Sequence, residues 1–230
     1  MTAVSTRRTA AVAGLLYLLT FAASIPAVLL LQPVLNDPNY IVSGGADTQV
    51  TAGAFLDIVN ALACVGTAVV LFSVVKLVHE GMALGFVTTR MFEAAVIAIG
   101  VVCILAIVAI RQHPPAGTDP SSLIAVDQGL VAVRNATFLL GPSTMPAFNA
   151  LLLGTLLYRS RLIPRWIPAL GLIGAPLLLA SSIGILFGVN QPTSIWTGLA
   201  TIPIFLWELS LGLWLVIRGF NREAVSDLIH

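Results

Sequence analysis

The sequence predicts an all-α integral membrane protein with six transmembrane helices and both chain ends in the cytoplasm. Three observations predict this class. Charged residues make up only 9% of the 230 residues, whereas soluble domains have about 25%. The mean hydropathy is +0.99. Several charge-free stretches also provide the roughly 20 residues that a helix needs to cross the hydrocarbon layer.

Gaps between charged residues place the six spans, which together form one domain over residues 1–230. We expect spans at residues 9–31, 52–78, 84–110, 135–158, 167–187 and 195–217. A turn-like GVNQP segment separates the last two. The first span follows Arg7 and Arg8 and has an apolar run of about 23 residues, longer than the 7–15 of a signal-peptide core. We therefore expect a retained helix rather than a cleaved signal.

The positively charged residues predict the orientation. With the N-terminus inside, eight of the eleven Lys and Arg residues lie at inner ends or in inner loops, whereas Arg111 and Arg134 lie on the outer side or at its boundary. The inner set is Arg7, Arg8, Lys76, Arg159, Arg161, Arg165, Arg218 and Arg222. An odd number of spans would move the C-terminal arginines outside, so the bias favours six.

Two outer segments connect the spans. Residues 32–51 contain acidic residues and no Lys or Arg. Residues 121–133 have the pattern of a short helix opened by a serine cap, and they are too few to cross the bilayer. We expect a short interfacial helix on the outer surface, and the alternative is an outward extension of the fourth span.

Ionisable side chains within the spans mark a candidate site. Each costs about 2.5–3.5 kcal/mol near the bilayer centre, so such groups usually face a partner or a cavity. Arg90 and Glu93 lie on one face of the third span near its inner end. Glu208 in the sixth span and Asn149 in the fourth have similar depths, roughly 14 Å above the inner boundary. The sequence therefore predicts an inner polar cluster of Arg90, Glu93, Asn149 and Glu208.

This cluster has two interpretations that the sequence leaves open. In the first, it is the site of a small transporter or of a binder of a small or lipid-like molecule, or it is a proton relay. In the second, the protein is a structural or regulatory membrane partner, and the charges only fix helix packing. A continuous cavity that reaches the cluster would favour the first interpretation, and a dry, fully paired cluster would favour the second.

A second polar pair is predicted near the outer side. Asp57 of the second span and Arg134 at the start of the fourth lie at compatible depths. The pair is either an interhelical clamp or an outward-facing substrate site. The fourth span also contains Pro142 and Pro146, which remove two helix hydrogen bonds. This segment is either a packing kink or a broken helix of the kind that lines sites in transporters.

Several function classes lack their signatures. The chain has no H-E-x-x-H motif, no glycine-rich phosphate loop and no G-x-S-x-G motif, and no His lies within a predicted span. We therefore expect no catalytic residues, metal site or cofactor. The net charge of +1 gives no reason to expect nucleic acid. Cys64 and Cys103 are interpreted as buried free thiols. The expected partner is the lipid bilayer, and the oligomeric state stays open.

Four segments in order resemble a known family. They are RTAAVAGLLYL at residues 8–18, Arg90-x-x-Glu93, LLYRSRLIPRWIPALG at residues 156–171, and Glu208 followed by GLWL at residues 212–215. Together they resemble the bacterial membrane-protein family called domain of unknown function 4386. The resemblance implies a multi-pass protein of the bacterial inner membrane. It implies no catalytic or ligand-binding residue.

Overall fold

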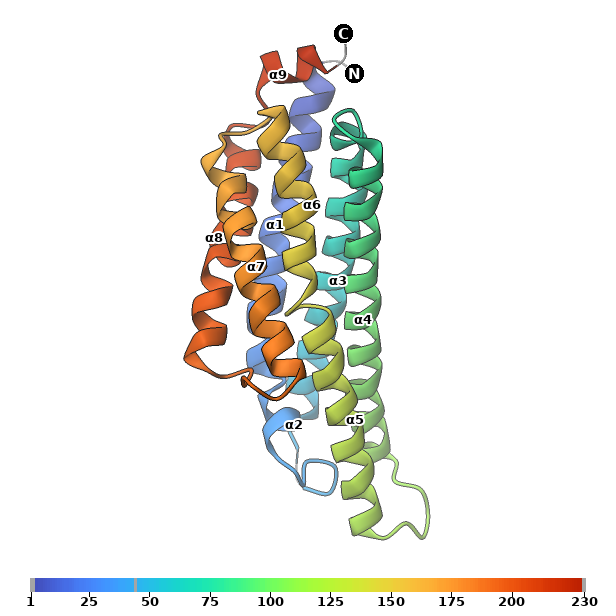
Figure 1. Ribbon diagram of the computed structural model, residues 1–230. Helices are drawn as coiled ribbons and strands as arrows, with labels where there is room; N and C mark the ends of the chain where they lie inside the picture. Colours follow the sequence, from blue (N-terminus) through green and yellow to red (C-terminus); the bar gives the residue numbers. More distant parts are fainter. Residues whose placement is uncertain (1–2, 44, 229–230) are drawn as a thin grey trace.

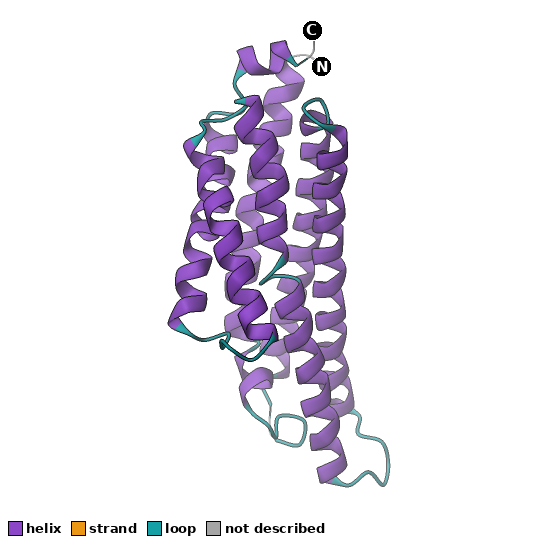
Figure 2. Ribbon diagram, viewed as in Figure 1, coloured by secondary structure: helices purple, strands orange, loops and turns teal. Residues whose placement is uncertain are grey.

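The computed structural model describes residues 3–43 and 45–228, and these form helices joined by short loops, without a strand (Figure 2). Six segments are long and apolar enough to cross a membrane, as the hydropathy predicts, and α5 and α6 together make one of them. The helices are α1 (Ala3–Leu30), α2 (Gln32–Asn36), α3 (Asp47–Val75), α4 (Glu80–Gln112), α5 (Pro120–Leu140), α6 (Met145–Ser160), α7 (Trp166–Leu186), α8 (Ile195–Ile217) and α9 (Arg222–Asp227).

Side-chain caps explain where several of these helices begin. The His79 ring accepts a hydrogen bond of 3.2 Å from the Met82 amide and opens α4. Ser194 accepts one of the same length from the Thr197 amide and opens α8. Each cap satisfies an amide that has no partner within its helix. The short helices α2 and α9, of five and six residues, are far too short to cross a bilayer and were not expected.

The long helices pack into a closed ring. α1 contacts α3, α3 contacts α4, α4 contacts α5 and α6, α6 contacts α7, α7 contacts α8, and α8 returns to α1. Figure 1 shows them running along one common direction. α1 begins and α9 lies at one end of the bundle, which we call the α9 end, and the opposite end is the α2 end. Side chains on the inner faces therefore converge from several helices.

Two glycines allow the ring to close between α1 and α8. A Cβ atom built on Gly14 would lie 2.6 Å from the carbonyl oxygen of Gly212, closer than atoms can approach. Small residues at such crossings let the backbones of membrane helices come together. The glycine in the first-span segment RTAAVAGLLYL thus has a packing role.

The separate interfacial helix expected at residues 121–133 is wrong as stated. These residues form the first half of α5, which continues without a break to Leu140. Asp119 caps this helix by accepting a hydrogen bond of 2.9 Å from the Ser122 amide, and Pro120 occupies its first turn. No proline occurs between Pro120 and Pro142, so the helix continues from the fourth span toward the α2 end.

The fourth span is broken in its middle. The helix ends at Leu140, four residues form a turn, and α6 begins at Met145. The Thr144 hydroxyl donates a hydrogen bond of 2.6 Å to the Leu139 carbonyl. The Ser182 hydroxyl of α7 donates one of 3.1 Å to the Ser143 carbonyl. The amides of Ser143 and Ala147, which would serve these two carbonyls in an unbroken helix, bond to the Phe138 and Thr144 carbonyls instead. Side chains thus satisfy the carbonyls that the break leaves without helical partners.

Two apolar cores fill the ring. The larger one lies toward the α9 end and includes Tyr17, Phe86 and Trp207. The smaller one lies toward the α2 end and includes Ile97 and Ile104. On α4, the polar residues predicted for the cluster lie between Phe86 and Ile97, and therefore between the two cores.

Candidate functional site

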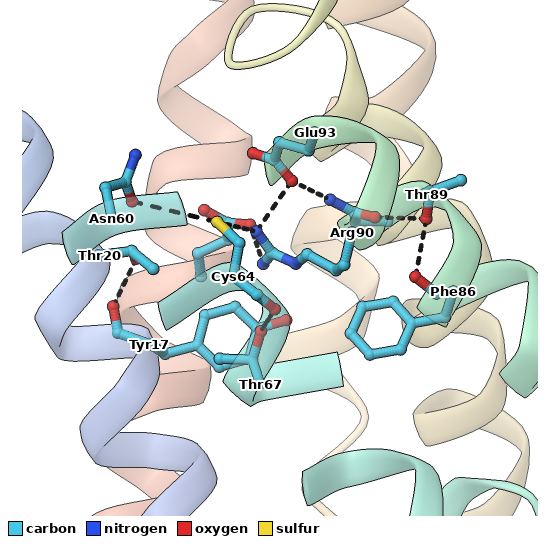
Figure 3. A network of polar contacts seen from close by, with 11 residues as sticks. Tyr17, Thr20, Asn60, Cys64, Thr67, Phe86, Thr89, Arg90 and Glu93 are labelled. Atoms are coloured by element: carbon cyan, nitrogen blue, oxygen red, sulfur yellow. Dashed lines mark hydrogen bonds and ion pairs between the residues drawn. The ribbon is translucent and has the colours of Figure 1, made fainter. Parts of the chain in front are cut away.

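The four residues predicted for the inner cluster meet inside the ring. Arg90 and Glu93 come from α4, Asn149 from α6 and Glu208 from α8. Arg90 and Glu93 lie one helical turn apart, so both side chains leave the same face of α4. Figure 3 shows this polar network with Arg90 at its centre. The structure therefore brings together the four side chains that the depth estimates grouped.

Arg90 connects two carboxylates. Its Nη1 lies 3.1 Å from Oε2 of Glu93, and its Nη2 lies 2.9 Å from Oε1 of Glu208. The side chains of Arg90, Glu93 and Glu208 are 2%, 6% and 13% exposed. Low dielectric strengthens such hydrogen-bonded ion pairs, and it also makes any unpaired charge there expensive. Glu208 is the most accessible of the three.

Asn149 extends the cluster to α6. Its Nδ2 donates a hydrogen bond of 2.8 Å to Oε2 of Glu93, the oxygen that also accepts from Arg90. The Thr89 hydroxyl lies 2.6 Å from Oδ1 of Asn149 and donates to it. The break before Met145 ends one turn ahead of Asn149, so the start of α6 is held against α4 through these bonds. The broken span and the charged cluster are thus one structural unit.

Two further uncharged residues contact Arg90, and the sequence did not mark them as its neighbours. The Cζ atom of Arg90 lies 5.0 Å from the ring centroid of Tyr17 on α1, a distance typical of a cation–π contact. The Sγ atom of Cys64 on α3 lies 3.6 Å from Nη1 of Arg90. A tyrosine within an otherwise apolar span is the one signal that could have indicated the first contact.

The cluster has more potential negative than positive charge. One guanidinium faces two carboxylates, so the formal charge is −1 when both carboxyls are ionised. In addition, Nε of Arg90 is buried and has no hydrogen-bond partner in the part of the chain that the structure describes. A net charge in a low-dielectric interior is costly. A proton or a cationic group beside a carboxylate would balance it.

The predicted outer pair also forms. Nη2 of Arg134 lies 3.7 Å from Oδ2 of Asp57, too far for a hydrogen bond. A cavity of about 20 Å³ beside them has room for one water molecule. The Arg134 guanidinium also lies over the Phe138 ring, 4.6 Å from its centroid. This pair joins α3 to α5 and is a looser contact than the inner cluster.

A group of polar contacts at the α2 end fixes the segment between α1 and α3. Arg111 at the end of α4 forms an ion pair with Asp47 and donates a hydrogen bond of 2.7 Å from Nη2 to the Ser43 carbonyl. The Tyr40 hydroxyl donates one of 2.8 Å to Oδ1 of Asp47. Burial, together with this bond to a carboxylate, raises the pKa of Tyr40. These contacts tie the loop between α1 and α3 to α4.

The described residues contain no cluster of typical metal ligands. Across residues 3–43 and 45–228, no group of three or more His, Cys, Asp or Glu side chains could hold a metal ion. Cys64 and Cys103 are buried free thiols, as the sequence predicted.

The comparison with protein families gives one match. A family model described as Domain of unknown function (DUF4386) matches residues 12–219. The chain belongs to this family. The DUF4386 match begins in α1 and ends after α8. It therefore includes most of α1, all the other helices of the ring and all members of the inner cluster. It confirms the resemblance found in the sequence. No curated protein matches the chain. No solved structure matches it either.

Proposed function

We propose that this DUF4386 protein is a small transporter, or a binder of a small solute, whose site is the inner cluster of Arg90, Glu93, Asn149 and Glu208. One observation carries the proposal: a single guanidinium faces two carboxylates inside the ring. A purely structural network is most stable when its charges balance. The excess carboxylate instead suits a site that takes up a proton or a cationic group.

The surroundings of the cluster support a solute site. The Glu208 side chain is 13% exposed, whereas that of Arg90 is 2% exposed, so one carboxylate is reachable while its partner is fixed. The broken span contributes Asn149 directly after its break. Discontinuous helices commonly line the binding sites of transporters, because their free ends supply unpaired backbone groups.

The protein's place in the cell is part of the same proposal. We infer a multi-pass protein of the bacterial cytoplasmic membrane with the α9 end facing the cytoplasm. The excess of Lys and Arg at that end supports this orientation. The bacterial setting rests on the family resemblance.

A structural role is the second candidate, and the pairing of Arg90 favours it. Both terminal nitrogens of its guanidinium are bonded to carboxylates, and α4 is thereby joined to α8. In this role the cluster fixes how the helices pack and takes up nothing. The two candidates therefore differ in whether the cluster holds an exchangeable proton.

Infrared spectroscopy of the protein in lipid nanodiscs tests this difference. A protonated carboxyl has a carbonyl band distinct from the bands of a carboxylate. We expect this band near neutral pH in the wild type, its loss in Glu93→Gln or Glu208→Gln, and its retention in the control Glu223→Gln on the exposed surface of α9. A carbonyl band that is absent near neutral pH, or that is unchanged in both Glu93→Gln and Glu208→Gln, would leave the cluster with a structural role only.

A further inference from the structure

A groove at the α9 end contains arginines that the inner cluster does not use. It lies between the turn joining α6 to α7 and the turn joining α8 to α9, and its volume is about 630 Å³. Arg161 and Arg165 line it from the first turn, and Arg218 lines it from the second. Trp214 and Phe220 add an apolar wall. Pockets for small ligands are typically about 300–1,000 Å³ in volume.

These three arginines have no acidic partner among the described residues. The four ion pairs found there involve other arginines, and all three groove residues are exposed. Arg7 at the same end differs, because it donates hydrogen bonds of 3.1 Å and 2.7 Å to the carbonyls of Leu215 and Val216 at the end of α8. Arg7 thus has a structural role that the groove arginines lack.

The backbone at Arg161 gives a second, independent observation. This residue follows α6 in the left-handed conformation, with φ 54°, and no other non-glycine residue of the described chain has a positive φ. Glycine is the usual residue at such a helix end, because a Cβ atom is unfavourable there. An arginine at this position costs conformational free energy, and its placement at the groove gives a reason for that cost.

The groove is held in shape before any ligand arrives. The Asn221 amide donates a hydrogen bond of 2.8 Å to the Leu162 carbonyl and so joins the two turns. Arg165 lies over the Tyr158 ring, 5.1 Å from its centroid, and its Nε lies 3.4 Å from the Tyr158 carbonyl. These contacts orient Arg165 and leave its terminal nitrogens for another acceptor.

We propose that this groove binds the phosphate group of an anionic ligand. Guanidinium groups match phosphate oxygens in geometry and charge, and three arginines line this groove. Basic pockets at the cytoplasmic ends of membrane helices are suited to anionic lipid headgroups, and Trp214 and Phe220 would contact the apolar part of such a lipid. A free phosphate ion would contact only the arginines and would not use the apolar wall. Both ligands present a phosphate group, and the experiment distinguishes a lipid headgroup from a free phosphate ion.

Native mass spectrometry of the full chain in detergent measures the binding. The probes are phosphatidylglycerol, zwitterionic phosphatidylcholine and inorganic phosphate. We expect phosphatidylglycerol to bind more tightly than phosphatidylcholine, and we expect Arg218→Gln to raise its dissociation constant about tenfold. Arg159→Gln is the matched control. It removes one exposed charge from the last turn of α6, outside the groove, and should change the constant less than twofold, as single exposed charges do.

The variant Arg161→Gly tests whether a loss of phosphatidylglycerol binding can occur without a loss of stability. Glycine suits the left-handed backbone, so the variant should melt at the same or a higher temperature while phosphatidylglycerol binds about tenfold more weakly. If inorganic phosphate also binds, and the groove substitutions weaken its binding as much as that of phosphatidylglycerol, the groove would be assigned to a soluble ligand. Equal binding of phosphatidylglycerol by the wild type, the groove variants and Arg159→Gln would overturn the proposal, as would no binding of either anionic probe.

Discussion

Arg90 of α4 and Glu208 of α8 form an ion pair of 2.9 Å although 118 residues separate them in the chain. The two helices are not neighbours in the ring order, so the pair reaches across its interior. Glu93 and Asn149 complete the connection to α6. The stability of the ring and the chemistry of the proposed site therefore depend on the same few side chains.

Replacing Arg90 by Met should destabilise the protein strongly. The change leaves Glu93 and Glu208 without their cation, and breaking a buried ion pair in this way typically costs about 3–5 kcal/mol. Thermal unfolding in detergent measures the effect, with Arg159→Gln as the control. A melting temperature equal to that of the control would show that the cluster contributes little to stability.

Removing all three charges together should recover most of that loss. In the variant Arg90→Met/Glu93→Gln/Glu208→Gln no uncompensated charge remains, and apolar or neutral replacements of buried ion networks are often tolerated. The same unfolding measurement compares the triple variant with Arg90→Met alone. If both melt at the same temperature, the lost interaction is the packing of the Arg90 side chain and not its charge.

The two carboxylate pairs should differ in strength. Glu208→Gln should lower the free energy of unfolding by about 1–3 kcal/mol, because it weakens a charged hydrogen bond of a buried group. Asp57→Asn should cost less than Glu208→Gln, because its partner lies 3.7 Å away, too far for a hydrogen bond, beside a cavity large enough for water. Denaturant titration in one detergent gives both values. The reverse order would contradict the assignment of the inner cluster as the tighter site.

The orientation predicts a simple labelling pattern. Single cysteines placed at residues 36–48, in a chain with Cys64 and Cys103 replaced by alanine, should react with an impermeant thiol reagent from outside the cell only. Residue 44 lies outside the described residues, so exposed described positions such as Asn39 and Thr48 are preferred. Both native cysteines are buried, and their replacement should leave the fold intact. Labelling from the cytoplasmic side alone would reverse the proposed topology.

The spans and the charged cluster could be predicted from the sequence because each has a strong physical signal. Charge-free stretches define the spans because a bilayer excludes charge, and a constant rise per residue placed Arg90, Glu93 and Glu208 at one level. The separate helix expected at residues 121–133 was wrong, because these residues alone are too short to cross a bilayer and nothing local shows that they continue into the next span.

Other features could not be predicted, because their signals have several explanations. Tyr17 and Cys64 are apolar enough to belong to any span, and only the ring order brings them to Arg90. Arg161 and Arg218 have a sufficient explanation as topology signals, so nothing in the sequence marks them as lining one groove. The left-handed backbone of Arg161 is likewise visible only in three dimensions.

Labelling by dicyclohexylcarbodiimide, an apolar reagent that attacks protonated carboxyl groups, tests the central claim most directly. If Glu208 is the reachable, protonatable carboxyl of a solute site, peptide mass spectrometry should find the label on Glu208. The labelling rate should fall as the pH is raised, because the reaction needs the protonated acid. The less exposed Glu93 should react more slowly. A folded protein in which Glu208 stays unlabelled at every pH would contradict the claim and leave the cluster with a structural role.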